Sequence, residues 1–172
     1  MNSPTKTRSA PLSETETNMR TIQRDIVTGL IFSKDGKLLQ ARKNPKGGGV
    51  YADCWHIPGG GSEAGESLEQ ALTREMREEV GLDLSVLTIT LVDDIGRGIS
   101  EKTLPTGEKV SCEMKFYIYR VDLPTDAADT KVTVGDDIQQ YRWTELAELT
   151  TLKITPPSTE LFKRLGYIPS ST

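Results

Sequence analysis

Long hydrophobic runs are absent from this sequence, and cysteine and histidine are scarce. No apolar stretch approaches the roughly 20 residues that a membrane-spanning helix needs, so we expect no membrane partner. The two cysteines, Cys54 and Cys112, are too few for a disulfide scaffold and lack the paired spacing of a zinc site. They indicate free thiols in a reducing compartment. The single histidine, His56, has no obvious second nitrogen ligand for a metal.

An excess of positive charge is also missing. The sequence has 21 basic and 25 acidic residues, a formal net charge of -4 and a pI near 5.2. Proteins that bind long nucleic acids usually carry an excess of positive charge, so we expect no long nucleic acid partner. A single nucleotide held by a few local groups remains compatible with this charge.

The first 20 residues differ in composition from the rest of the 172-residue chain. They are rich in Ser, Thr and Pro and have few large apolar residues, so they cannot bury enough surface to offset the entropy of ordering. We expect a mobile tail over residues 1–20 and one folded domain over 21–168. The tail has no apolar segment typical of export, and Glu14 and Glu16 argue against an organelle transit peptide. A cytoplasmic location follows as an expectation.

The folded part alternates between strand-like and helix-like hydrophobic periods, which predicts an α/β fold with a sheet covered by helices. A tight turn at Asp35-Gly36 joins the first two expected strands, because glycine readily adopts positive φ. Strands are expected over 26–32, 38–41, 84–92, 110–121 and 141–143, helical segments over 67–80, 145–149 and 158–165, and loops over 43–54 and 95–109. The second loop is long enough to contact a ligand.

The helix at 67–80 has the clearest boundaries and the most informative surface. Ser67 and Gln70 form a capping-box pattern, and Gly81 suits the position just after the helix. At 100° per residue, Glu75 and Glu79 fall on the apolar stripe and Glu78 adjoins them. Unpaired carboxylates are costly to bury, so a positive group is required there. A hard oxygen-only ligand set suits Mg²⁺ or a similar cation.

A plainer interpretation also exists for these glutamates. Most charge runs on helices are solvated faces, and pairs spaced i,i+4, such as Arg74 and Glu78, stabilise a helix without binding any ligand. On the three carboxylates alone this interpretation is favoured.

The residues around the helix reverse that preference. From Gly60 to Leu82 the sequence follows the pattern G-x5-E-x7-R-E-U-x-E-E-x-G-U, where U is a bulky aliphatic residue. This segment resembles the signature box of the Nudix hydrolase family. Every fixed position is filled, by Gly60, Glu66, Arg74, Glu75, Glu78, Glu79 and Gly81. The segment Trp55 to Gly60 and the residues near Trp143 also resemble the family, so the similarity covers most of 24–165.

The resemblance implies a Nudix-type α/β/α sandwich with a mixed sheet, in which a loop-helix-loop holds divalent cations. By this similarity Glu75, Glu78 and Glu79 face the metal and take part in catalysis. Glu66 supports the metal site, Gly60 offers its carbonyl oxygen as a ligand, and Arg74 orients a glutamate. The cofactor implied is Mg²⁺, or Mn²⁺ in its place.

The family does not place its general base uniformly, so further acidic residues remain candidates. Asp136 and Asp137, before the last expected strand, would supply an extra metal ligand or a base, and Glu101 in the long loop would do so or meet the substrate. A solvated turn is an equally good interpretation of all three.

Substrate contacts are less visible in the sequence. Arg42, Lys43 and Lys46 would meet phosphate groups or be solvated surface charges, and both interpretations stay open. Trp55 and Tyr51 would stack on a base or anchor the core. Cys54 invites comparison with prenyl diphosphate isomerases of the same fold, but its neighbours do not match them.

The function implied is Mg²⁺-dependent hydrolysis of a phosphoanhydride bond in a nucleoside diphosphate linked to another moiety. Nucleoside triphosphates, oxidised nucleotides and nucleotide sugars all remain open as substrates. The alternatives are a nucleotide-binding sensor without turnover and a prenyl diphosphate isomerase. The expected partner is a small-molecule nucleotide, and a homodimer is left open.

Overall fold

A seven-stranded mixed sheet forms the centre of the computed structural model, which describes residues 19–47 and 51–170. Five strands run in the order β4-β6-β1-β2-β7, with β3 beside β1 and β5 beside β6. The strands are β1 (Thr21–Phe32), β2 (Leu38–Lys43), β3 (Gly59–Gly61), β4 (Thr90–Asp93), β5 (Arg97–Thr103), β6 (Lys109–Asp122) and β7 (Ile138–Thr144). The central pair β1 and β6 is parallel and the other pairs are antiparallel.

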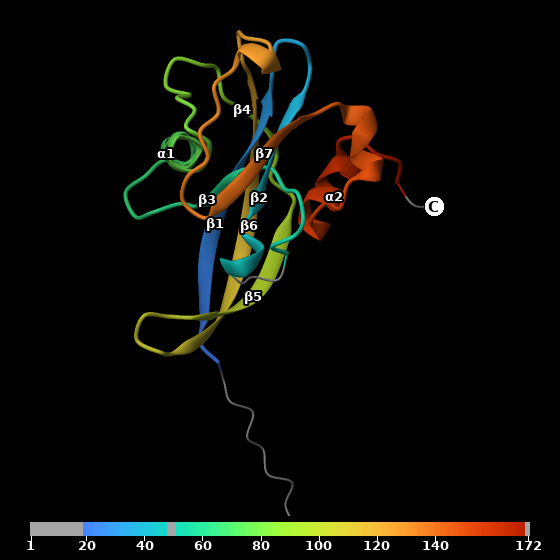
Figure 1. Ribbon diagram of the computed structural model, residues 1–172. Helices are drawn as coiled ribbons and strands as arrows, with labels where there is room; N and C mark the ends of the chain where they lie inside the picture. The colour runs from blue at the N-terminus through green and yellow to red at the C-terminus, as the bar shows by residue number, and fades with distance from the viewer. Residues whose placement is uncertain (1–18, 48–50, 171–172) are drawn as a thin grey trace, which may run out of the picture.

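Two helices cover opposite faces of this sheet (Figure 1). They are α1 (Leu68–Val80) and α2 (Pro156–Arg164). Side chains of β1 alternate between two hydrophobic cores, because successive residues of a strand point to opposite faces. Val27 and Ile31 join the core under α1, whereas Leu30 and Phe32 join the core under α2. The α/β/α sandwich with a mixed sheet is therefore confirmed.

Local sequence signals placed several elements correctly. The turn between β1 and β2 contains Gly36 at φ 82°, and Phe32 pairs with Leu38 across it. On its other side β2 pairs with β7 from Leu38 to Lys43. Helix α1 has the expected capping box, and Gly81 ends it at φ 69°.

The expected strand over 84–92 is wrong for most of its length. Only β4, from Thr90, is a strand there. The Oδ1 atom of Asp83 accepts a hydrogen bond from the backbone N–H of Ser85, and the N–H of Leu87 donates to the carbonyl of Leu84. These bonds close a turn, which buries Leu84 without strand pairing.

The expected loop over 95–109 is also wrong, because most of it is strand. β5 pairs with β6 along its whole length, and a turn with Gly107 at φ 86° connects them. Since β5 lies at an edge and is exposed along almost its whole length, it lacks the alternating hydrophobic pattern that marks a strand in sequence.

The smaller helical segments differ in type or extent from expectation. The segment expected over 145–149 is a 3-10 helix, Leu146–Thr151, and α2 begins two residues before the expected start at Ser158. Two other 3-10 turns occur, Pro45–Gly47 and Ala127–Asp129. Within the described ranges no helix has the length and apolar character to cross a membrane.

The chain ends are only partly described. Most of the tail expected over 1–20 lies outside the described residues, as do residues 48–50 of the expected loop. Arg20 lies inside them and binds Glu108 through Nε and Nη2, both at 2.9 Å. Arg20 therefore contacts the β5–β6 turn just before β1 begins.

Candidate active site

Helix α1 presents the box glutamates at two levels of burial. Its apolar side packs into the core through Ala71, Leu72, Met76 and Val80. Glu75 and Glu79 lie on the same side and are only 8% and 4% exposed, whereas Glu78 is exposed. The helical projection from sequence therefore identified the two carboxylates that the fold buries.

Arg74 is at the centre of an ion-pair network over these carboxylates. Its Nε and Nη2 atoms donate to the two oxygens of Glu66 at 2.6 and 3.1 Å. Its Nη1 atom donates to Glu75 at 2.8 Å and to Glu78 at 3.2 Å, and Nη2 also reaches the carbonyl of Gly61. The hydrogen bond from Arg74 lowers the pKa of Glu66. One guanidinium thus fixes three carboxylates.

Glu79 has a different environment. The backbone N–H of Gly59 donates to its Oε2 atom at 2.8 Å. Burial raises the pKa of Glu79 to about 8, and the neighbouring charges of Glu75 and Asp137 add to the rise. Desolvation also raises the pKa of Glu75. Glu79 is therefore costly to ionise unless a positive charge comes close, whereas Glu75 already has Arg74 beside it.

The side-chain and carbonyl atoms around α1 that could bind a metal are all oxygens, which are the ligands that hard divalent cations prefer. Gly60 leaves open the space beside Glu75, since a Cβ at position 60 would lie 2.6 Å from Oε1 of that residue. In the described part of the chain, no three His, Cys, Asp or Glu side chains already stand in position to share one ion. Arg74 bridges these carboxylates instead.

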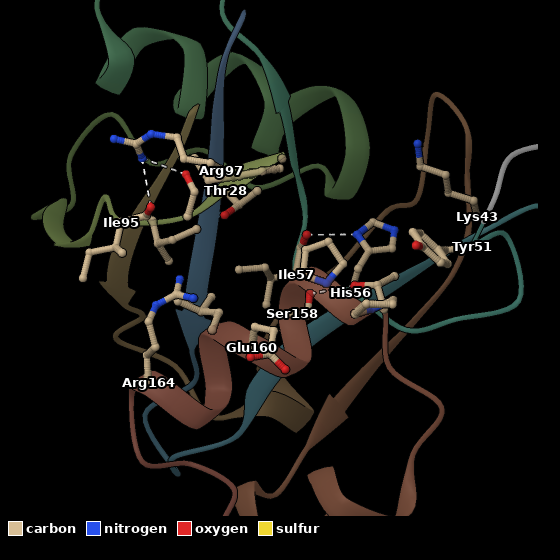
Figure 2. A pocket seen from close by; sticks show the side chains of 18 of the residues that line it. Thr28, Lys43, Tyr51, His56, Ile57, Ile95, Arg97, Ser158, Glu160 and Arg164 are labelled. Carbon is tan, nitrogen blue, oxygen red and sulfur yellow. Dashed lines mark hydrogen bonds between the residues drawn. The ribbon is translucent and has the colours of Figure 1, made fainter. Parts of the chain in front are cut away.

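A cavity of about 790 Å³ lies between the sheet and α2 (Figure 2). Gly59, which binds Glu79, lines this cavity, so the buried carboxylate lies directly behind its wall. Lys43 and Asp137 also line it and form a salt bridge of 2.8 Å. Figure 2 shows Lys43 and Tyr51 on one side and Ile95, Arg97 and Arg164 on the other. The cavity has the size and position of a ligand site.

Two buried polar atoms of the cavity residues have no hydrogen-bond partner among the residues that the structure describes. They are Oγ1 of Thr28 and Nε2 of His56. Nδ1 of His56 lies 2.9 Å from the carbonyl oxygen of Ile57, which can only accept, so Nδ1 carries the hydrogen. Burial lowers the pKa of His56, which favours the neutral ring.

The structure brings only some of the sequence-derived site residues to this place. Asp137 lines the cavity and pairs with Lys43. Arg42 does not line it: its guanidinium lies 4.7 Å from the Trp55 ring centre, so these two residues contact each other. Glu101 lies on β5, exposed and paired with Lys109. Cys54 is buried, burial raises its pKa, and it does not line the cavity.

Sequence reasoning missed much of the cavity wall. Thr28 comes from β1, Phe116 from β6, and Arg164 from α2, and nothing in their local sequence singles them out. Two signals pointed in the right direction. The length of the connection expected over 95–109 suggested ligand contact, and Ile95, Gly96 and Arg97 do line the cavity. The Pro156-Pro157 pair marks the start of the helix that closes the cavity.

Comparisons with known proteins agree with this geometry. The NUDIX domain model matches residues 22–165. The nucleoside triphosphatase NudI of Escherichia coli is 35% identical over 130 residues, which cover 74% of this chain and 85% of that protein. Among solved structures, the MutT protein of Methanosarcina mazei aligns with a TM-score of 0.60 at 23% identity, over 87% of this chain and 96% of its own.

A second solved structure shows the same fold. The dihydroneopterin triphosphate pyrophosphohydrolase of Escherichia coli aligns with a TM-score of 0.57 at 18% identity, over 81% of this chain and 92% of its own. At such identities the two structures establish the architecture, while the family model and NudI carry the relationship in sequence.

Proposed function

The chain belongs to the Nudix family, and from this premise we propose that it hydrolyses a phosphoanhydride bond of a nucleoside triphosphate in an Mg²⁺-dependent reaction. The family consists of enzymes that use divalent cations, and its members act on small nucleotides, so the prediction of a pyrophosphohydrolase is confirmed at that level. The substrate, the metal and the roles of individual residues are the parts that we propose.

One observation carries the proposal. The buried carboxylate of Glu79 is bound to Gly59, and Gly59 forms part of the wall of a nucleotide-sized cavity. The buried carboxylate and the cavity therefore lie on the two sides of one backbone segment, which supports a metal site beside a substrate site. Among the substrates left open by the sequence, the triphosphate is favoured because NudI, the relative at 35% identity, is named a nucleoside triphosphatase.

We assign the metal-binding oxygens to Glu75, Glu78 and Glu79, with the carbonyl of Gly60 and the carboxylate of Asp137 as additional donors. When bound, the cation would neutralise phosphate charge and lower the pKa of a coordinated water. Arg74 holds one oxygen of Glu75 and one of Glu78, which leaves the other oxygen of each carboxylate for the cation. Its bidentate contact with Glu66 fixes the guanidinium beside these glutamates.

Other residues bind and orient the substrate in this proposal. The ammonium group of Lys43 lies at the side of the cavity close to Glu79, where the charge of Lys43 lowers the pKa of that glutamate. It is therefore placed to pair with a phosphate oxygen of the substrate. Burial raises the pKa of Glu79 in the metal-free protein, and a cation bound to this carboxylate would favour its ionised form.

The prenyl diphosphate isomerase alternative gains no support from the site, because the cysteine that suggested it is outside the cavity wall described above. The two buried thiols in the structure, Cys54 and Cys112, are both free, and we keep the cytoplasm as the proposed compartment.

The test is hydrolysis of a nucleotide panel by the purified protein. The panel contains nucleoside triphosphates, oxidised nucleotides and nucleotide sugars, with Mg²⁺, with Mn²⁺ or with a chelator. We expect triphosphates to be cleaved only when a divalent cation is present, and Glu78→Gln to lower kcat by at least about 100-fold. Glu69→Gln, an exposed glutamate on the same helix, is the matched control and should keep full activity.

Two results would reject the proposal. The first is the absence of hydrolysis of every triphosphate, and the second is undiminished activity of Glu78→Gln. If only nucleotide sugars were cleaved, the protein would still have the hydrolase activity of the family, but the proposed triphosphate substrate would be wrong.

A further inference from the structure

The two sides of the cavity differ in chemistry. Lys43 and Asp137 lie on the side near Glu79, where the phosphates of a nucleotide would be held. The opposite side contains the apolar side chains of Ile95 and Phe116 together with the guanidinium groups of Arg97 and Arg164. A nucleotide that places its phosphates near Glu79 would therefore place its base between these apolar side chains and the guanidinium groups.

Arg164 is held at this side by a buried carboxylate. Its Nε and Nη2 atoms donate to the two oxygens of Asp93 at 3.0 and 2.9 Å, and the Asp93 side chain is only 5% exposed. A Cβ at Gly96 would lie 3.5 Å from Nη2 of Arg164 and 3.4 Å from Cβ of Phe116, so the guanidinium and the aromatic side chain are close neighbours. The Nη1 group of Arg164 makes no hydrogen bond with any residue that the structure describes.

Arg97 is held by backbone carbonyls instead of a carboxylate. Its Nη1 atom donates to the carbonyl oxygens of Asp94, Ile95 and Gly96 at 2.8, 3.0 and 2.8 Å. Figure 2 shows its side chain close to Ile95 at the same side of the cavity as Arg164. Its Nε and Nη2 groups are not engaged by other residues within the described ranges.

Guanidinium groups donate hydrogen bonds and cannot accept them. The carboxylate of Glu160 also lines the cavity, but it is 64% exposed and accepts a hydrogen bond from Lys163 at 3.0 Å. The free hydrogen-bonding groups of Arg97 and Arg164 are thus donors only. A carbonyl oxygen on the base satisfies them, whereas an amino group at the same place leaves two donors facing each other.

We infer that Arg97 and Arg164 make the protein select bases with an exocyclic carbonyl oxygen over bases with an amino group at the corresponding position. Uracil, thymine, guanine and hypoxanthine belong to the favoured class, and cytosine and adenine to the disfavoured one. This inference rests on the proposed function, because it requires a nucleotide in the cavity with its phosphates near Glu79.

The test compares matched substrates that differ at this group. The pairs are UTP with CTP, and inosine triphosphate with ATP. We expect kcat/KM to favour the carbonyl member of each pair on the order of tenfold, mainly through KM. In the double variant Arg97→Met/Arg164→Lys the preference should fall to within about twofold, because lysine keeps the ion pair with Asp93 but lacks the separate Nη1 arm of the guanidinium.

The control variant is Arg120→Lys. Arg120 also forms a bidentate pair, with Asp122, but it lies on β6 and does not line the cavity. This variant should keep the preference of the unmodified protein. Thermal unfolding shows whether each variant still folds. The single variant Arg97→Met is a second check, because Arg97 has no carboxylate partner in the described structure that its loss would leave unpaired.

Binding separates this inference from the proposed function. The dissociation constants of the non-hydrolysable α,β-methylene analogues of UTP and CTP are measured by calorimetry for the same proteins. If no triphosphate is hydrolysed, the proposed function fails, but tighter binding of the UTP analogue that is lost in the double variant still supports the inference. Equal binding of both analogues, or a preference that persists in the double variant, would overturn it.

Discussion

Burial of the Glu79 carboxylate gives the metal-free protein a specific dependence of stability on pH. Its pKa of about 8 in the folded chain lies well above the ordinary value of 4.5. Between these values the folded state binds more protons than the unfolded state, so the free energy of unfolding falls as the pH rises from about 5 to about 8. Each pKa unit corresponds to about 1.4 kcal/mol, so the total effect is a few kcal/mol at most.

We predict that Glu79→Gln removes this dependence. Glutamine can still accept the hydrogen bond from Gly59 but does not ionise, so the variant should be more stable than the unmodified protein at pH 8 in a chelator. Urea unfolding at several pH values measures the difference. Added Mg²⁺ should stabilise the unmodified protein at pH 8 and have little effect on the variant. Parallel pH profiles for the two proteins would contradict the assignment.

Arg74 makes contacts that lysine cannot replace. Its guanidinium reaches Glu66, Glu75 and Glu78 at once, whereas an ammonium group would hold one of them well. We predict that Arg74→Lys lowers kcat by about 10- to 100-fold with little change in KM, because the glutamates lose their positions while the cavity stays intact.

Steady-state kinetics measures the effect of Arg74→Lys, and Arg77→Lys is its control. Arg77 lies on the same helix but is exposed, and in the described structure its salt bridge is with Asp83. A change in KM alone for Arg74→Lys would assign this residue to substrate binding instead of positioning.

At the scale of single elements, the sequence predicts what local interactions determine. The ends of α1 follow from Ser67, Gln70 and Gly81, which bond or turn the backbone within a few residues. The edge strand β5 could not be predicted in this way, because neighbouring strands and not its own hydrophobic pattern stabilise it. Leu84 shows the opposite error, since a buried apolar residue there belongs to a turn.

The capping box of α1 offers a test at this scale. The Oγ atom of Ser67 accepts from the N–H of Gln70 at 3.1 Å, and the Gln70 side chain accepts from the N–H of Ser67 at 2.8 Å. We predict that Ser67→Ala lowers the free energy of unfolding by about 1 kcal/mol in urea titrations. Ser100→Ala, at an exposed position on β5, is the control, and an equal loss in both variants would contradict a capping role.

At the scale of the whole molecule, the candidate site divides into a predictable and an unpredictable half. The glutamates were predictable because one helix carries them in a fixed spacing. The cavity was not, because its wall combines Thr28, Phe116 and Arg164, which are far apart in sequence and meet only in the folded sheet. The resemblance to a family therefore predicts the chemistry, whereas only the structure shows the cavity that we propose for the substrate.

The domain limits remain a prediction at this scale. The carbonyl of Arg20 accepts from the N–H of Ser111, and the Arg20 side chain binds Glu108, so we expect a chain that begins at Met19 to keep its Tm within about 2 °C. A chain that begins at Asp25 loses the first pairs of β1 with β6 and should unfold several degrees lower. Calorimetry measures both, and sedimentation velocity on the same samples tests for a homodimer.

The parallel pairing of β1 with β6 also determines when the protein can fold during synthesis. Partner residues in this pair are 90 positions apart, and β1 has apolar side chains on both faces. At roughly 5 to 20 residues per second, a ribosome needs several seconds to deliver β6 after β1 has been made. During this interval the nascent chain exposes an unpaired hydrophobic strand that is prone to aggregate. A chaperone that shields its first forty residues should therefore raise the yield of native protein.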